Sequence, residues 1–418
     1  MQSIPASELA RQILDACLNE GTWSARVLDA LIERALDEDD PILASGATRA
    51  LFGIVIERLG DLFEPALCDL YARLFSYVIA RAMPEYRAAD LLVRYQRVRQ
   101  VRKFSGGEVQ NVFVLSRVTL GADIAVTSVA LAAAKQRFPQ ARIHFVGPAK
   151  NAELFGADPR IEPVVVPYGR SKALRERLLA ASELKAAMEA PEAIVIDPDS
   201  RLTQLGLLPI GDDSRYYFFE SRAFGGTTDT ALPDLTAEWL AEVFDTPRAR
   251  PYLAPPPQPR IAEIAVSFGV GENADKRAGG DFEYEVLRAL LGYNVPVILD
   301  RGAGGEEAER VTALAERLRF PAPLHLHDGS YASFAGHIVQ SRLYMGYDSA
   351  GQHVAHAAGV PLVSVFTGYA SERMLARWRP CGPKARVVAI DTSNRETALE
   401  RTLEAICRSW AEEAERTD

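Results

Sequence analysis

The stretch "MGYDSAGQHVAHAAGVPLVSVFTG", residues 345–368, contains the end of an apolar strand, a polar turn, a helix of mostly small residues and a second apolar strand. A strand, a helix and another strand in succession are typical of a parallel sheet with crossover helices. Polar residues from Asp348 to His353 fall where the helix should begin. The stretch therefore predicts an α/β fold with a polar turn at the carboxyl end of a strand, where such sheets bind ligands.

The same alternation of short apolar runs and amphipathic segments extends from Asn111 almost to the end of the chain. It is interrupted by "TPRARPYLAPPPQPR" (246–260), whose prolines disfavour helix and strand and predict a stiff linker. We therefore expect two Rossmann-like, doubly wound parallel-sheet domains facing each other across a cleft. The first spans 106–250, and the second spans 251–418 and includes a C-terminal helix.

Residues 1–105 show helical periodicity alone, as in "SARVLDALIERAL" and "ALCDLYARLFSYVIARAM". They predict an all-helical N-terminal domain, and "KFSGGE" (103–108) is the expected hinge to the next unit. The pattern leaves two roles open for these helices, self-association into a homo-oligomer or docking of an acceptor.

Composition narrows the class of protein. The chain has 418 residues, 48% of them hydrophobic and 25% charged, and a net charge of −9, which disfavours nucleic acid as a partner. No apolar run approaches the roughly 20 residues that span a bilayer, and the N-terminus has no basic flank with an apolar block. We expect a cytoplasmic protein with, at most, peripheral membrane contact. Four widely spaced cysteines indicate free thiols and no metal or disulfide framework: Cys17, Cys68, Cys381 and Cys407.

The opening stretch resembles the donor-site signature of the ADP-heptose:lipopolysaccharide heptosyltransferase family, a pattern close to G-N-D-T-G-P-M-H-L-A-A-A-L-G-V-P. The identical positions are Gly346, Asp348, His353, Ala355, Ala357, Gly359, Val360 and Pro361. A second segment, "VLSRVTLGADIAVTSVALAAAKQRFPQARIHFV", resembles the family's first strand, its L-G-D-x-x-x-T turn, its first helix and its second strand. The resemblance runs from about Asn111 to the C-terminus.

This resemblance implies a GT-B fold, with the acceptor bound by the first domain and a nucleotide sugar by the second. It implies an inverting, metal-independent glycosyltransferase without a cofactor, which moves a heptose-like sugar from an ADP-heptose type of donor to a hydroxyl of a glycan, lipid or protein. The chain departs from the pattern in three places. Ala122 is an extra residue before Asp123, Ser349-Ala350-Gly351 replaces Thr-Gly-Pro, and Lys276-Arg277-Ala278 lacks the family's tryptophan.

A helix N-terminus holds a diphosphate well, because its unpaired N–H groups carry about half a positive charge. Ser349, Ala350, Gly351 and Gln352 would supply donors to the pyrophosphate, with small residues permitting close approach. His353 would donate to a phosphate oxygen, and Asp348 would fix the turn or contact the sugar. The alternative is an ordinary N-cap, in which Asp348 or Ser349 satisfies the helix and nothing binds.

Lys276 and Arg277 lie in a glycine-bearing loop, "SFGVGENADKRAGGDF", that also contains Gly269 and follows the first strand of the second domain. A departing nucleoside diphosphate develops negative charge, and the resemblance assigns its stabilisation to Lys276. The alternative is a solvated basic pair on a loop.

Asp123 matches the family's general base, which takes the proton of the acceptor hydroxyl as it attacks the anomeric carbon. Thr127 follows four residues later, as in the family pattern, and Arg117 ends the first strand at a position suited to an acidic acceptor. The alternatives are a helix-capping aspartate and an exposed arginine at a strand end.

Other functions on the same fold also agree with the sequence. One is a transferase-like protein without turnover that senses a nucleotide sugar or acts as a scaffold, and another is a nucleotide-sugar epimerase. A dinucleotide dehydrogenase is excluded, because the turn "VLSRVTLGADI" has one glycine where the G-x-G-x-x-G fingerprint needs three.

Overall fold

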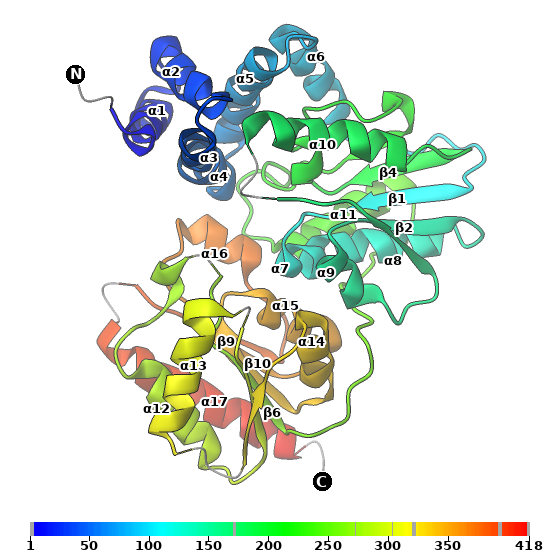
Figure 1. Cartoon of the computed structure of the whole chain (residues 1–418). Coiled ribbons are helices and arrows are strands. Elements are labelled where there is room, and N and C mark those ends of the chain that lie inside the picture. The colour runs from blue at the N-terminus through cyan, green and yellow to red at the C-terminus, as the bar shows by residue number, and fades with distance from the viewer. Residues whose placement is uncertain are drawn as a thin grey trace.

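A computed structural model describes residues 4–169, 173–271, 273–302, 304–319, 323–391 and 395–415. Two lobes lie one above the other, and a group of N-terminal helices lies beside the first lobe (Figure 1). Each lobe is a parallel sheet covered by helices. The predicted α/β class with two Rossmann-like domains is confirmed.

The first lobe contains five parallel strands in the order β3-β2-β1-β4-β5. Its strands are β1 (Asn111–Leu115), β2 (Arg142–Gly147), β3 (Ile161–Val165), β4 (Ala193–Asp197) and β5 (Tyr216–Phe218). Its helices and turns are α7 (Leu120–Ala122), the π-helical η2 (Asp123–Thr127), α8 (Ser128–Arg137), α9 (Ala149–Ala152), η3 (Glu153–Phe155), α10 (Leu174–Ala187), η4 (Arg201–Thr203), η5 (Asp213–Arg215) and α11 (Leu232–Phe244). Helices α8 and α11 cover one face of this sheet.

Strand β1 is buried along its whole length, and its side chains alternate between two hydrophobic cores. Val112 and Val114 face the core that α8 and α11 complete, whereas Phe113 and Leu115 face the opposite core. The period of two residues in a strand sends neighbours to opposite faces, so this sheet needs cover on both sides.

The N-terminal helices provide cover on the second face. They are α1 (Ala6–Glu20), α2 (Ala25–Ala35), α3 (Pro41–Ala50), the π-helical η1 (Leu51–Ile56), α4 (Glu57–Asp61), α5 (Pro65–Ala82) and α6 (Ala88–Val98). Phe75 and Tyr95 belong to the same core as Phe113 and Leu115. Tyr71 also donates to the carbonyl of Gln204 in the first lobe. Over described residues 4–105 only helices and coil occur, but these helices share one core with the first sheet.

The second lobe contains six parallel strands in the order β11-β10-β9-β6-β7-β8. Its strands are β6 (Ile264–Ser267), β7 (Val297–Asp300), β8 (Leu324–His327), β9 (Leu343–Tyr347), β10 (Leu362–Phe366) and β11 (Ala385–Ala389). Its helices and turns are η6 (Ala274–Lys276), α12 (Phe282–Leu291), α13 (Gly305–Arg317), α14 (Tyr331–Gln340), α15 (Ala350–Ala358), α16 (Glu372–Trp378), η7 (Arg395–Thr397) and α17 (Ala398–Glu415). The quoted signature therefore forms β9, α15 and β10.

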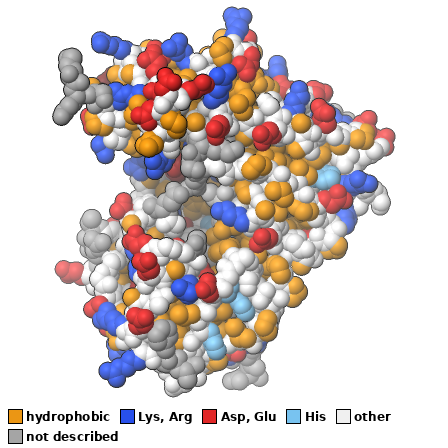
Figure 2. All heavy atoms as spheres, viewed as in Figure 1, with side chains coloured by type: hydrophobic (Ala, Val, Ile, Leu, Met, Phe, Trp, Pro, Cys, Tyr) orange, Lys and Arg blue, Asp and Glu red, His pale blue; other side chains and the backbone are white. Residues whose placement is uncertain are grey.

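The predicted linker, 246–260, contains neither helix nor strand. The lobes touch where α15 packs against α7 and η2. Figure 2 shows acidic and basic side chains intermixed on the visible face, with an indentation between the N-terminal helices and the second lobe. Among the described residues, no helix is both long enough and apolar enough to cross a bilayer.

Candidate functional site

The N-terminus of α15 has no side-chain cap among the residues that the structure describes. Ser349 occupies the N-cap position but makes no side-chain hydrogen bond to the first turn. Ser330 and Ser371, at the N-caps of α14 and α16, do accept such bonds, from Ser333 and Met374. Neither Asp348 nor Ser349 caps α15, which leaves its electropositive end open to an anion, as the ends of α12 and α13 also are.

Asp348 does not cap α15, and its carboxylate instead contacts the side chains of two other residues. Nζ of Lys276 lies 2.6 Å from Oδ2 of Asp348, and Nε2 of Gln352 donates to Oδ1 over 2.6 Å. Gln352 in turn accepts from Ser364 on β10 at 2.6 Å. Because Asp348 is only 7% exposed, the Lys276 ammonium supplies its counter-charge beside the helix end. The structure thus brings Lys276, Asp348 and Gln352 together.

Glycines set the positions of the loops around Lys276. A Cβ on Gly368, whose φ is +63°, would lie 2.5 Å from the carbonyl oxygen of Asp275, the residue before Lys276. A Cβ on Gly269 would lie 2.2 Å from Oε1 of Glu307 on α13. Gly269 therefore makes room for a carboxylate. Arg277 follows η6 and is partly buried. Burial raises the pKa of Glu283, and the charge of Arg277 partly offsets this rise.

The glycines of the signature are explained by Tyr344 on β9. A Cβ on Gly346 would lie 2.3 Å from the Tyr344 hydroxyl, and one on Gly351 would lie 2.0 Å from it. The space that each missing side chain leaves is therefore filled by a tyrosine of the same lobe. The sequence alone suggests that small residues here let a phosphate approach. In the structure they let Tyr344 lie under the start of α15.

His353 is buried between the lobes. Its ring centroid lies 5.7 Å from that of Trp378 on α16. Burial lowers its pKa to about 3, with smaller contributions from His356 and Lys276. The imidazole is therefore neutral at pH 7, and any hydrogen bond it gives to a phosphate would come from a neutral ring nitrogen.

Asp123 is fully buried just after β1, and each of its carboxylate oxygens accepts two hydrogen bonds. The donors are Ser116 Oγ at 2.6 Å, the Arg117 backbone N–H at 2.7 Å, Thr127 Oγ1 at 2.7 Å and Asn151 Nδ2 at 2.6 Å. Burial raises the pKa of Asp123, although these four bonds act in the opposite direction. The predicted partner Thr127 thus contacts Asp123 directly.

The extra residue Ala122 precedes a π-helical turn, η2, that begins at Asp123. A π turn closes its hydrogen bond over one more residue than an α turn, which accommodates an insertion without shifting the rest of α8. In the same loop, Val118 has a φ of +62°. A β-branched residue there costs about 1–3 kcal/mol, and such strain is concentrated at functional sites.

Arg117 is also buried, at 5% exposure, which contradicts the alternative of an exposed arginine at a strand end. Its Nη1 donates to the carbonyl of Pro198 at 3.1 Å and to the hydroxyl of Ser221, and it lies 3.9 Å from Asp199. Burial lowers the pKa of Arg117 to about 10, with a further contribution from Arg222. The guanidinium faces the junction between the lobes, because it lies over the ring of Trp378, 5.8 Å from its centroid.

The two halves of the predicted site meet at Gly121. A Cβ on this residue would lie 3.0 Å from Cδ2 of His353 and 3.3 Å from Cα of Ala350. The loop that contains Asp123 therefore lies directly on the N-terminal end of α15. Predicted acceptor-side and donor-side residues are brought together, with the lobes closed against each other.

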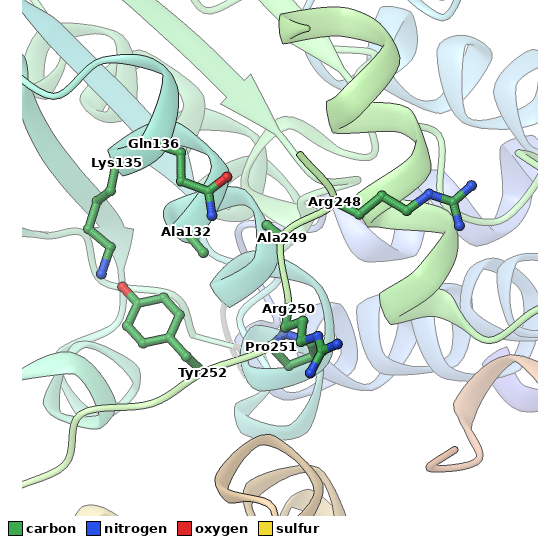
Figure 3. Close-up of a pocket in the computed structure, with 8 residues that line it drawn as sticks. All are labelled: Ala132, Lys135, Gln136, Arg248, Ala249, Arg250, Pro251 and Tyr252. Carbon is green, nitrogen blue, oxygen red and sulfur yellow. The ribbon is translucent and has the colours of Figure 1, made fainter. Parts of the chain in front are cut away.

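Two cavities lie away from these residues. One is a surface groove of about 540 Å³ beside α8 and the linker, lined by Ala132, Lys135, Gln136, Arg248, Ala249, Arg250, Pro251 and Tyr252 (Figure 3). The other, about 10 Å³, lies between the N-terminal helices and the first lobe, and it has room for about one water molecule. No predicted site residue lines either of them.

Several contributors were missed by sequence reasoning. Ser116 and Asn151 bind Asp123, and Trp378 contacts both Arg117 and His353. Ser116 had a signal, since it directly precedes Arg117 at the end of an apolar run. Asn151 and Trp378 had none, because their contacts join segments far apart in the sequence. In the described ranges no cluster of three or more His, Cys, Asp or Glu residues could hold a metal ion.

Comparison with known proteins gave matches among solved structures. E. coli heptosyltransferase WaaC with ADP aligns with 73% of this chain and 100% of its own, at a TM-score of 0.52 and 16% identity. E. coli ADP-heptose LPS heptosyltransferase II aligns equally widely, at a TM-score of 0.54 and 18% identity. A family 9 glycosyl transferase from Veillonella parvula DSM 2008 covers 74% of this chain and 99% of its own, at 0.54 and 16%.

No protein-family model matches the chain, and no curated protein matches it. At such identities a structural likeness establishes the fold. More than a quarter of this chain lies outside each alignment, while the solved structures align over almost their full length. The predicted fold is therefore confirmed: this chain has the two-lobed GT-B architecture of the heptosyltransferases that it resembles.

Proposed function

We propose that this protein is a glycosyltransferase that binds a nucleotide sugar between its lobes and transfers the sugar to an acceptor hydroxyl. One observation carries the proposal. The uncapped N-terminus of α15, with Lys276 beside it, lies against the loop that contains Asp123. A site for a pyrophosphate and a candidate base thus come from opposite lobes.

On the donor side, the first-turn N–H groups of α15, from Ala350 to Gln352, would bind the pyrophosphate. Lys276 would exchange one contact to Asp348 for a phosphate oxygen. Its ammonium then offsets the charge that builds up on the leaving nucleoside diphosphate. His353, Arg277 and Gly269 would complete the proposed donor set.

On the acceptor side, Asp123 would accept the proton of the hydroxyl that attacks the anomeric carbon. Attack from the face opposite the departing diphosphate inverts that carbon. Both oxygens of Asp123 are occupied, so this role requires Ser116 or Thr127 to rotate its hydroxyl away. Arg117 would then orient an acidic group of the acceptor. A resident metal ion has no part in this scheme.

The donor that we propose is of the ADP-heptose type. The support is the match between the signature around Asp348 and the heptosyltransferase pattern, together with the solved structures of that kind whose fold this chain shares. The acceptor is a hydroxyl of a glycan, lipid or protein.

A second candidate function is a nucleotide-sugar sensor or scaffold without turnover. The observation that favours it is that the charged groups of the site are already paired with other protein groups. Lys276 is paired with Asp348, and the carboxylate of Asp123 has four partners. Such a protein would bind the donor and leave it intact.

Calorimetry and a turnover assay separate these functions. The purified chain is titrated with ADP, ADP-heptose and UDP, and release of ADP from ADP-heptose is followed with candidate acceptors. Binding with acceptor-dependent release supports the transferase, and binding without release under any acceptor supports the sensor. Absence of binding by any nucleotide contradicts both. Cytoplasmic location and self-association through the N-terminal helices also remain predictions, to be checked by fractionation and light scattering.

A further inference from the structure

Helix α16 belongs to the second lobe but binds the first. Arg377, which is fully buried, donates from Nη1 to the carbonyl of Thr230 at 2.7 Å and from Nη2 to that of Gly226 at 3.0 Å. Arg373 donates to the same Gly226 carbonyl at 3.1 Å. Two guanidinium groups of the second lobe therefore donate hydrogen bonds to a single backbone oxygen of the first. Figure 1 shows α16 on the side of the second lobe that faces the N-terminal helices.

The turn that contains Gly226 has a backbone conformation that exposes its carbonyl oxygen to both arginines. Gly225 and Gly226 have φ values of +80° and +55°, a region that other residues rarely adopt. A Cβ on Gly225 would also lie 2.7 Å from Leu235 on α11, so the turn packs against the first lobe itself. Hydrogen bonds from a charged donor are stronger than neutral ones, which makes this contact suitable for holding two lobes together.

The N-terminal helices take part in the same contact. Arg373 also donates to the carbonyl of Phe63 at 3.2 Å, and its Nε lies 3.5 Å from Oε1 of Glu64. The ring of Phe63 meets that of Trp378 edge to face, with centroids 6.1 Å apart. Helix α16 thus links the second lobe to the first lobe and to the N-terminal helices.

The contact also reaches the candidate site. Trp378, the last residue of α16, packs against His353 on α15 and lies near Arg117 after β1. In this arrangement the Cα of Ala350 is 3.3 Å from where a Cβ of Gly121 would be. The loop of Asp123 therefore lies directly over Ala350 and His353, and a ligand that approaches the start of α15 from this side meets that loop.

We propose that Arg373 and Arg377 are positioning residues that form a latch between the lobes, and that the donor enters only when their bonds to Gly226 release. This inference rests on the proposed function. Re-formation of the latch returns the loop of Asp123 to the N-terminus of α15. The latch therefore opposes donor association and favours the chemical step that follows.

The test uses the full chain with Arg373→Met, which removes one of the two guanidinium groups of the latch at a partly exposed position. Arg373→Lys keeps the charge near Glu64 but loses the forked geometry, and it should give a weaker effect. Arg386→Met is the matched control. Arg386 is also partly exposed, and it binds Ser409 and Glu412 within the second lobe. Circular dichroism confirms that each variant is folded.

Two measurements are made on each variant. Hydrogen exchange without ligand reports the amides of 120–127 and 350–355, and stopped-flow mixing with ADP reports the association rate. We expect faster exchange in both segments, an association rate about tenfold higher in Arg373→Met, and a kcat for sugar transfer that falls severalfold. A merely structural role would not raise the association rate.

The outcomes separate the two hypotheses. Equal exchange and equal ADP association in Arg373→Met, Arg386→Met and the unaltered protein overturn the latch while the proposed function stands. Faster exchange in Arg373→Met, with no ADP binding by any variant, supports the latch and contradicts the proposed function.

Discussion

Nζ of Lys276 lies 2.6 Å from Oδ2 of Asp348, and the two residues come from loops at the carboxyl ends of neighbouring strands, β6 and β9. The carboxylate is 7% exposed, so it depends on this ammonium for charge balance. Lys276 therefore has two roles, to stabilise the folded chain and, as proposed, to offset the charge of the leaving nucleoside diphosphate.

Replacing Lys276 with Met should separate these two needs. We expect the free energy of unfolding to fall by about 2 kcal/mol, because a nearly buried carboxylate loses its partner. The affinity for ADP should fall about 10- to 100-fold, as measured by calorimetry.

The double variant Lys276→Met, Asp348→Asn should recover most of the stability without recovering affinity for ADP. A double variant that binds ADP as well as the unaltered protein would rule out Lys276 as a phosphate ligand. Lys384→Met serves as the control, since Lys384 is exposed and donates to the carbonyl of Gly359.

Asp123→Asn tests whether the buried carboxylate is more than an anchor. An amide presents two donors where Asp123 accepts four bonds, so the free energy of unfolding should fall by roughly 2–4 kcal/mol in denaturant titrations. Sugar transfer should be lost while ADP still binds, because the donor contacts lie on the other lobe. Ordinary turnover by a folded Asp123→Asn protein would leave Asp123 with a structural role alone.

Gly351→Ala probes the packing under α15. The new Cβ would lie 2.0 Å from the Tyr344 hydroxyl and 2.5 Å from its Cζ, so the unfolding free energy should drop by about 1–3 kcal/mol. In a Tyr344→Phe background the loss should be smaller, because the nearest atom is gone. Additive losses in this double-mutant cycle would show that Tyr344 is not the reason for the glycine.

The pH dependence of stability should carry the signature of His353. Its pKa is about 3 when folded, against 6.5 for an unperturbed histidine, so the unfolded chain binds more protons between these values. Stability attributable to this residue is present above pH 6.5 and is lost as the pH falls toward 3. Between about pH 6.5 and 4.5 the unaltered protein should lose roughly 2–3 kcal/mol more than His353→Gln.

Buried acids such as Glu220, whose pKa burial raises to about 7, act in the opposite direction in this window. They are common to both proteins and cancel in the difference. Equal pH slopes for the two proteins would mean that His353 titrates normally.

Much of the fold follows from local pattern. Strands β1 to β4 of the first lobe and all six strands of the second are visible in the sequence as short apolar runs, and the proline-rich linker lacks regular structure as predicted. Strand β5 (Tyr216–Phe218) was missed, because three residues are too few to show a period. Helix α16 was missed as well, since its partners lie in the first lobe and among the N-terminal helices.

The candidate site was predicted less completely than the fold. The position of Asp348 at a strand end could be predicted from the motif, but its pairing with Lys276 could not, since 72 residues separate them. The contact between Gly351 and Tyr344 could not be predicted for a related reason, because Tyr344 lies on the preceding strand. Asn151, which contacts Asp123, and Trp378, which covers Arg117, lie far from these residues in the sequence, so no local pattern records the burial of Asp123 and Arg117.

The shared core of the N-terminal helices and the first sheet has a practical consequence. Phe113 and Leu115 face those helices, so the part of the chain that resembles the transferases is not a free-standing unit. A truncated protein without the N-terminal helices would expose this hydrophobic face of the first sheet to water, and we expect it to precipitate. The N-terminal helices, which the sequence presents as a separate domain, form one covering layer of the first sheet.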